Sequence, residues 1–158
     1  MQGSRDIPID IISKENLNTI LKNKKKLSEL TFDKIFCSSL MRTHETAIIH
    51  GYQNFNIDKR LDELNFGKYE GRPKVEMQTD VMQLWKNNPK ELVLGEPISD
   101  FFNRIDDFIE NVEAQKILIF SHGAVMRYLK SKYILNNSSL MNQISIANGE
   151  ILELSIKS

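Results

Sequence analysis

The segment Lys116-Ile-Leu-Ile-Phe-Ser-His-Gly123 decides the fold of this 158-residue chain. Its uninterrupted apolar run, residues 117–120, is typical of a strand that is buried on both faces of a parallel sheet. An earlier segment, Asp33-Lys-Ile-Phe-Cys-Ser-Ser-Leu-Met-Arg42, has the same order of features and predicts a strand over 34–37. Each strand should be followed at once by a helix, so the first junction delivers an arginine and the second a histidine.

The remaining periodicity predicts several helices and a C-terminal hairpin. Helices are expected at 13–30 with Ser13 as the cap, at 40–50, from 79 through Trp85, at 99–113 with Ser99 as the cap, and at 123–135. Two strands, 143–147 and 150–156, should pair through the turn Asn148-Gly149. Alternating strands and helices predict an α/β three-layer sandwich with a mostly parallel sheet.

Composition narrows the class of protein. The length suits a single domain over residues 1–158, and 21 basic residues balance 21 acidic ones. Such neutrality argues against nucleic-acid and membrane-surface partners. Cys37 is the only cysteine and is expected to be buried in its strand. The absence of an apolar membrane span or signal-peptide core in the sequence favours a cytoplasmic location.

Arg42 and His122 are the first candidates for a functional site. In a parallel sheet, ligands bind at the carboxyl ends of the strands, where helix N-termini present free N–H groups to an anion. Arginine forms paired charge-assisted hydrogen bonds with phosphate, and an imidazole can donate to a phosphoryl oxygen and titrates near neutrality. A carboxyl group near such a pocket could supply a proton to the leaving oxygen, and Glu63 and Glu70 are the candidates.

Five motifs in collinear order resemble those of the histidine phosphatase superfamily, in its phosphoglycerate mutase-like branch. They are Gln2-Gly-Ser-Arg-Asp-Ile-Pro8, Phe32 to Ala47, Leu61-Asp-Glu-Leu-Asn-Phe-Gly-Lys-Tyr-Glu-Gly71, Gly95-Glu96 and Ser121-His-Gly123. Two positions depart from the pattern of the family, since Tyr69 replaces a tryptophan and Pro97 stands where serine is usual.

This resemblance implies a site and an activity. It implies Arg42 as a phosphate ligand, His122 as a hydrogen-bond donor to the transition state and Glu63 as the proton donor. Further phosphate or substrate contacts are expected from Gly123, Gln2, Gly3 and Ser4. The parent activity would be hydrolysis of small phosphorylated metabolites through a phosphohistidine, with no cofactor and no metal. The short segment 73–97 favours hydrolysis over mutase transfer.

One family feature has no counterpart in this chain. Members of the family open with a strand that ends in Arg-His-Gly, whose histidine is the nucleophile, and no such motif is present. His44 and His50 are not spaced to replace it. These 158 residues alone are therefore expected to be catalytically inactive or impaired. Its working form would carry about 15–20 further N-terminal residues, a size estimated from the family pattern.

Two consequences of the missing strand are expected. An empty slot should lie between the strands that end at Ser39 and at Phe120, and the sheet should rearrange or be filled by a homo-oligomer. A non-catalytic relative that binds a phosphorylated ligand or a protein partner remains the alternative function.

Overall fold

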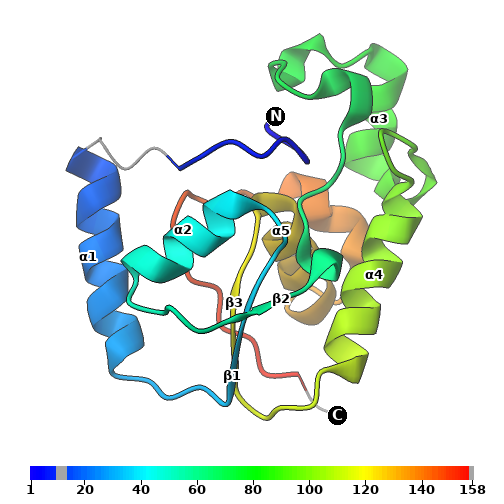
Figure 1. Ribbon diagram of the computed structural model, residues 1–158. Helices are drawn as coiled ribbons and strands as arrows, with labels where there is room; N and C mark the ends of the chain where they lie inside the picture. Colours follow the sequence, from blue (N-terminus) through cyan, green and yellow to red (C-terminus); the bar gives the residue numbers. More distant parts are fainter. Residues whose placement is uncertain (10–13, 157–158) are drawn as a thin grey trace.

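The sheet of this protein has three parallel strands in the order β2-β1-β3 (Figure 1). The computed structural model describes residues 1–9 and 14–156. Strands β1 (Lys34–Cys37) and β3 (Ile117–Phe120) have the bounds expected from their apolar runs. They pair in register from Lys34 opposite Ile117 to Cys37 opposite Phe120. The two-residue strand β2 (Asn56–Ile57) pairs with the other edge of β1.

The described residues form five α-helices. They are α1 (Lys14–Ser28), α2 (Met41–Ile49), α3 (Thr79–Asn87), α4 (Ile98–Asn111) and α5 (Gly123–Tyr133). Short 3₁₀ helices lie between α2 and α4, and another, η5 (Ser138–Gln143), follows α5. The expected cap Ser13 falls outside the described residues. Because α4 already begins at Ile98, after Pro97, Ser99 lies in its first turn and is not the cap.

Helices cover both faces of the sheet, as the α/β three-layer arrangement requires. Successive side chains of a strand point to opposite faces. Phe36 packs edge-on against Phe108 of α4, with 5.0 Å between the ring centroids. Cys37 and Phe120 form a second, smaller core with Ala47 of α2. Cys37 is fully buried, as expected.

The larger core lies between α4, α5 and the segment 64–92. Phe101, Phe102 and Ile105 of α4 are buried there, and Phe102 stacks on Tyr128 of α5 at 4.2 Å between centroids. Trp85 of α3 is buried in the same cluster. This packing fixes α5, and therefore the end of β3, relative to the loops that follow η1 (Lys59–Leu61).

The expected C-terminal hairpin is wrong in its strands. A turn does form, because the Glu150 N–H donates to the Ala147 carbonyl at 3.1 Å and Gly149 has a φ of +71°. Residues 144–156, however, form no ladder with each other or with the sheet in the described part of the chain. Strand pairing needs a neighbouring edge in reach, and local alternation of side chains cannot supply it.

The expected empty slot between β1 and β3 is also wrong, because these strands pair directly. The unpaired edge is instead the outer edge of β3. The Lys116 and Phe120 carbonyls accept hydrogen bonds from Asp33 and Ser38 on the β1 side. Since backbone groups alternate in direction along a strand, Ile117 and Ile119 present theirs to the outer edge. Within residues 1–9 and 14–156, no strand pairs with that edge.

Helix α1 packs less than its apolar pattern indicates. Leu27 is buried, but the Leu17 and Leu21 side chains are 49% and 58% exposed. The apolar face that the spacing of Leu17, Ile20, Leu21, Leu27 and Leu30 predicts is therefore wrong over most of this helix. It stands at the side of the molecule, next to α2 (Figure 1). None of the helices in the described ranges is long and apolar enough to cross a membrane.

Candidate active site

Arg42 and His122 meet at the carboxyl ends of β1 and β3. Arg42 is the second residue of α2, and His122 lies between β3 and the first residue of α5. The Arg42 Nε–H donates to His122 Nδ1 at 3.2 Å, although 80 positions separate the two residues. The two side chains are buried, and the sequence-based expectation that they share one site edge is correct.

The hydrogen bonds around His122 fix the position of its proton. Arginine remains protonated, so Nδ1 must accept from Arg42, and the neutral imidazole carries its proton on Nε2. Nε2 lies 2.8 Å from the Ser38 hydroxyl oxygen and donates to it. Ser38 in turn is 3.1 Å from the hydroxyl of Thr43, which donates to the Leu40 carbonyl at 2.9 Å. The imidazole is thus the second member of an ordered polar chain.

His122 does not titrate near neutrality in this environment. Burial lowers its pKa from 6.5 to about 3, and the positive charges of Arg42 and Arg104 act in the same direction. The expectation of a side chain that changes charge near pH 7 is therefore wrong. At neutral pH, His122 is neutral and its single N–H donates to Ser38.

Glu63 lies against the N-terminus of α5. Its carboxylate accepts from the Ala124 N–H at 3.2 and 3.4 Å, and from the Leu64 N–H at 2.9 Å. Burial raises the pKa of Glu63, while these hydrogen bonds and the charges of Arg127 and Arg42 oppose the rise. A carboxyl group with a raised pKa keeps its proton at higher pH, which is what a general acid requires.

The Arg42 guanidinium, expected to bind phosphate, is bound by the protein itself. Arg42 Nη2 donates to the Gly3 carbonyl at 2.8 Å, and Nη1 donates to the Arg5 carbonyl. The Asp6 carboxylate accepts from the Met41 N–H at 2.8 Å, at the start of α2. One N–H at each helix N-terminus is bound by a carboxylate, that of Met41 by Asp6 and that of Ala124 by Glu63. Backbone carbonyls occupy the positions where phosphate oxygens would bind Arg42.

The other expected substrate contacts lie close by but are engaged differently. Ser4 donates through its N–H and its hydroxyl to the Glu70 carboxylate, both at 2.8 Å. Gln2 is exposed, and it forms no hydrogen bond with any other described residue. Gly123 begins α5, and a Cβ at its position would lie 3.3 Å from Arg127 Nη1 and 4.0 Å from Glu63 Oε2.

Arg104 is a positioning residue that no sequence pattern singles out. It donates to the carbonyls of Arg60 and Asp62 at 2.7 and 2.8 Å, and it pairs with Glu96 at 3.0 Å. Glu96 also accepts from the Asn65 N–H. On a helix such an arginine looks like any solvated charge, and only its partners reveal the role.

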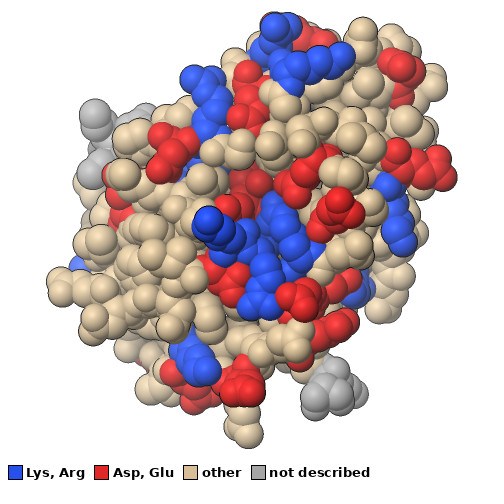
Figure 2. All heavy atoms as spheres, turned by 45° about the vertical axis from the view of Figure 1, so that its right-hand side comes forward, with Lys and Arg blue, Asp and Glu red and all other residues tan. Residues whose placement is uncertain are grey.

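On the face in Figure 2, basic side chains gather in the middle and carboxylates border them.

The remaining histidines are held away from the site chemistry. His44 Nε2 is 2.8 Å from the Ser38 carbonyl oxygen, and its ring packs on Phe55. His50 Nδ1 is 2.7 Å from the Thr46 carbonyl oxygen. Among the described residues, no group of three or more histidine, cysteine or acidic side chains could hold a metal ion.

A buried arginine and a neutral imidazole thus lie beside a buried carboxyl group at the carboxyl edge of a parallel sheet in an α/β protein. The chain belongs to the histidine phosphatase superfamily (branch 1), whose family model matches residues 1–158.

Three relatives illustrate the likeness. The alpha-ribazole phosphatase from Shigella flexneri is 25% identical, with a TM-score of 0.72 over 94% of this chain and 78% of that one. A phosphoglycerate mutase from Thermus thermophilus, 24% identical, has the same fold, with a TM-score of 0.65 over 83% and 73% of the two chains. A Hydrogenobacter thermophilus protein named "Putative phosphoserine phosphatase 2" is 33% identical over 60% of this chain. This chain spans about half of that relative, 52% of its length.

Proposed function

We propose that the parent activity of this chain is hydrolysis of small phosphomonoesters through a phosphohistidine. Arg42 binds the phosphoryl group and Glu63 protonates the leaving oxygen. His122 moves its Nε2–H from the Ser38 hydroxyl to a phosphoryl oxygen as charge develops. One observation carries the proposal: the 3.2 Å contact of Arg42 with a neutral His122, next to a carboxyl group whose pKa is raised. Phosphatase names among the relatives favour hydrolysis.

We further propose that these 158 residues turn over little substrate on their own. The nucleophile of the family is a histidine after an arginine, and the three histidines here are each held by other contacts. Uncatalysed phosphomonoester hydrolysis is among the slowest biological reactions, so binding without a nucleophile gives little rate. The nucleophile would come from a segment outside these residues.

The proposed substrate is a small phosphorylated metabolite, and the proposed location is the cytoplasm. Neither a cofactor nor a metal has a role in this scheme, because the proposed steps need only a nucleophile, a proton donor and hydrogen bonds to the phosphoryl oxygens.

The test is a phosphatase assay with para-nitrophenyl phosphate, combined with trapping of phosphohistidine from a radiolabelled phosphodonor. Both are run on the 158-residue chain and on the longest natural form of the protein. We expect turnover and a phosphohistidine only in a form that supplies Arg-His-Gly, with a loss of about 10²–10³-fold in Arg42→Ala, as for removal of one oxyanion donor. Equal turnover by the 158 residues would overturn the proposal about the nucleophile.

The role of Glu63 is tested by the leaving group. An alkyl phosphate needs a proton on its departing oxygen, whereas para-nitrophenolate leaves without one. Glu63→Gln in the active form should therefore slow hydrolysis of an alkyl phosphate by about 10²-fold or more, and that of para-nitrophenyl phosphate much less. Equal losses with both substrates would assign the proton to another group.

The second candidate is a non-catalytic relative that binds a phosphorylated ligand or a protein partner. The engagement of all three histidines favours it. Charge-assisted hydrogen bonds contribute about 1.5–3 kcal/mol each, so two such groups predict millimolar affinity at best for phosphate. Binding of phosphomonoesters without turnover by the longest natural form would support this second function.

A further inference from the structure

Ser38 is a fully buried residue whose hydroxyl accepts the hydrogen bond from the single N–H of the neutral His122 ring. It directly follows β1, and its own N–H donates to the Phe120 carbonyl at 3.3 Å. The backbone of Ser38 is therefore fixed against the end of β3. This position places its hydroxyl under the imidazole before any ligand binds.

The hydrogen-bonding capacity of the Ser38 hydroxyl is fully used. A hydroxyl has one donor and two acceptor positions. The Ser38 oxygen accepts from His122 Nε2 at 2.8 Å and from the Leu40 N–H at 3.2 Å. Its proton is directed to the Thr43 hydroxyl at 3.1 Å, because that hydroxyl donates onward to the Leu40 carbonyl at 2.9 Å. The Ser38 hydroxyl cannot rotate without breaking a hydrogen bond, so it is a fixed acceptor for the imidazole.

Donation from His122 to a phosphoryl oxygen is consequently an exchange of acceptors. The Nε2–H must leave the Ser38 hydroxyl before it can point to a ligand. The ring can turn, because the second side-chain torsion of histidine is broad. Hydrogen bonds to charged acceptors are about twice as strong as those between neutral groups. The exchange is therefore favourable for an oxygen that carries substantial negative charge and unfavourable for a neutral one.

We propose that Ser38 is a positioning residue, which withholds the His122 N–H from weakly charged ligands and releases it to a phosphoryl group. This inference rests on the proposed function, because it takes Arg42 as the residue that holds the phosphoryl group beside the imidazole. It adds an expectation that the function alone does not contain. Without the Ser38 hydroxyl, the N–H has no acceptor in the ligand-free protein, so a phosphoryl oxygen should bind more tightly.

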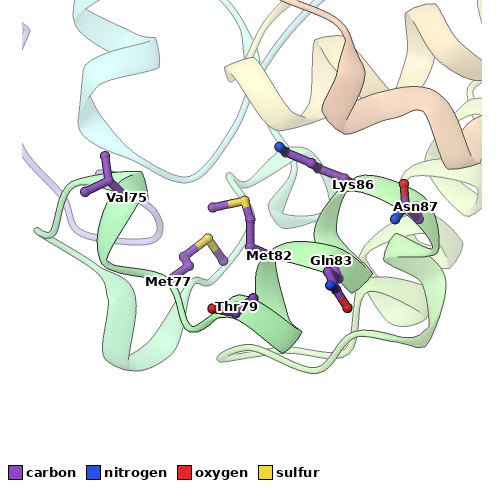
Figure 3. A pocket seen from close by; sticks show the side chains of 7 residues that line it. All are labelled: Val75, Met77, Thr79, Met82, Gln83, Lys86 and Asn87. Atoms are coloured by element: carbon purple, nitrogen blue, oxygen red, sulfur yellow. The ribbon is translucent and has the colours of Figure 1, made fainter.

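The surroundings of Ser38 are closed, which keeps a substitute acceptor away from the imidazole. Ser38, Thr43 and His122 are all buried. The cavity of about 340 Å³ in Figure 3 is lined by side chains between residues 75 and 87, and Ser38 is not among them. The small space left by one hydroxyl in Ser38→Ala does not open into this cavity. A water molecule needs both room and several polar partners, so the N–H should stay unpaired.

Calorimetry with inorganic phosphate is the first test, on the 158-residue chain. Ser38→Ala should be less stable in urea, yet its Kd for phosphate should be about tenfold smaller, the value of one hydrogen bond. A purely structural role predicts weaker binding, because a loosened site holds its ligand less well. Ser131→Ala is the matched control, since Ser131 is also fully buried and its hydroxyl donates to the Tyr128 carbonyl within α5. This control should lose stability and keep the wild-type Kd.

NMR of isotope-labelled histidine rings is the second test. The chain has three histidines, so His44→Gln and His50→Gln assign the ring signals. In the wild type, His122 should carry its proton on Nε2, and this Nε2–H resonance should move when phosphate binds. In Ser38→Ala the resonance should differ without ligand and coincide with that of the wild type at saturation, because the acceptor is then the same phosphoryl oxygen. The wild-type titration tests the exchange even if Ser38→Ala folds poorly.

The outcomes separate this inference from the proposed function. If phosphate binding depends on Arg42, as Arg42→Ala shows, but the wild-type Nε2–H resonance does not move, the role of Ser38 is overturned and that of Arg42 stands. An unchanged or larger Kd in folded Ser38→Ala also overturns the inference. Equal binding by Arg42→Ala, with the resonance still moving, supports the exchange at Ser38 and counts against the proposed function. No binding of phosphate at any soluble concentration overturns both.

Discussion

At the scale of the residue, the site depends on a polar chain with one direction. Arg42 donates to His122, His122 to Ser38, and Ser38 to Thr43. Each member is buried, so the loss of one partner leaves a donor or acceptor unsatisfied, at about 1–3 kcal/mol. The direction of the chain is set by the arginine, which can only donate. It keeps the imidazole neutral and oriented before any ligand arrives.

This polar chain predicts a pH dependence of stability. In the unfolded state His122 binds a proton below about pH 6.5, whereas in the folded state it does so only near pH 3. Between these values the unfolded state binds more protons, so the free energy of unfolding falls as the pH falls, by up to about 1.4 kcal/mol per pH unit. Stability from this source is fully present above about pH 6.5.

Urea unfolding of the wild type and of His122→Asn, at several pH values from about 4 to 8, measures the effect. Asparagine keeps an oxygen acceptor for Arg42 but does not titrate. The variant should have a smaller free energy of unfolding than the wild type at neutral pH. Below pH 6.5, its free energy of unfolding should fall less steeply with decreasing pH than that of the wild type. Identical slopes in the two proteins would contradict the assignment of a lowered pKa to His122.

At the scale of the element, Arg104 joins α4 to the loop that carries Glu63. One guanidinium binds two carbonyls of residues 60–62 and the Glu96 carboxylate, and Glu96 binds the next part of the loop. The rigid helix therefore determines where the carboxyl group of Glu63 lies. Gly95 makes the close approach possible, because a Cβ there would collide with the Asn65 side chain.

Replacing Arg104 with glutamine should reduce the free energy of unfolding by about 1.5–3 kcal/mol, since charge-assisted hydrogen bonds are lost and half-buried acceptors remain. The matched control is Arg72→Gln. Its ion pair with Glu76 has 3.9 Å between the charged atoms and is largely exposed, so the expected change is below about 0.5 kcal/mol. Chemical denaturation measures both, and equal losses would show that Arg104 does not anchor the loop.

The same scale explains what the sequence could reveal. Uninterrupted apolar runs mark buried strands, so 34–37 and 117–120 were predictable, and the rule for carboxyl ends placed Arg42 with His122. The prediction of strands at 143–147 and 150–156 was wrong, because strand pairing needs a neighbouring strand edge within reach and the alternation of side chains says nothing about that edge. The capture of Arg42 by the carbonyls of residues 3 and 5 was not predictable either, because any residue type supplies a backbone acceptor. Arg104 and Arg127 resemble solvated helix charges until their neighbours are known.

At the scale of the whole molecule, the outer edge of β3 stands out because its backbone groups have no strand partner among the described residues. Ile117 and Ile119 direct their backbone groups to it, and no strand of the described chain covers it. Exposed edges of this kind pair readily with another chain. We propose that the isolated 158-residue chain self-associates through this edge.

Ile119→Pro tests that proposal. Proline removes the outward N–H and leaves the groups that pair with β1 in place, because those belong to the alternate residues. Light scattering after size exclusion, over a range of concentrations, should show dimers of the wild type and of Ile119→Val, and monomers of Ile119→Pro. A wild type that stays monomeric at every concentration would refute self-association.

The two carbonyl oxygens on the Arg42 guanidinium have a consequence for any incoming anion. Binding becomes an exchange in which the opening residues of the chain must leave the guanidinium before a phosphoryl group can bind to it. The observed binding free energy of the anion is then its intrinsic binding free energy at Arg42 minus the free energy needed to release the opening residues from the guanidinium. Occupancy should also be visible at a distance from the ligand, as faster amide exchange and easier proteolytic cleavage around residues 3–5.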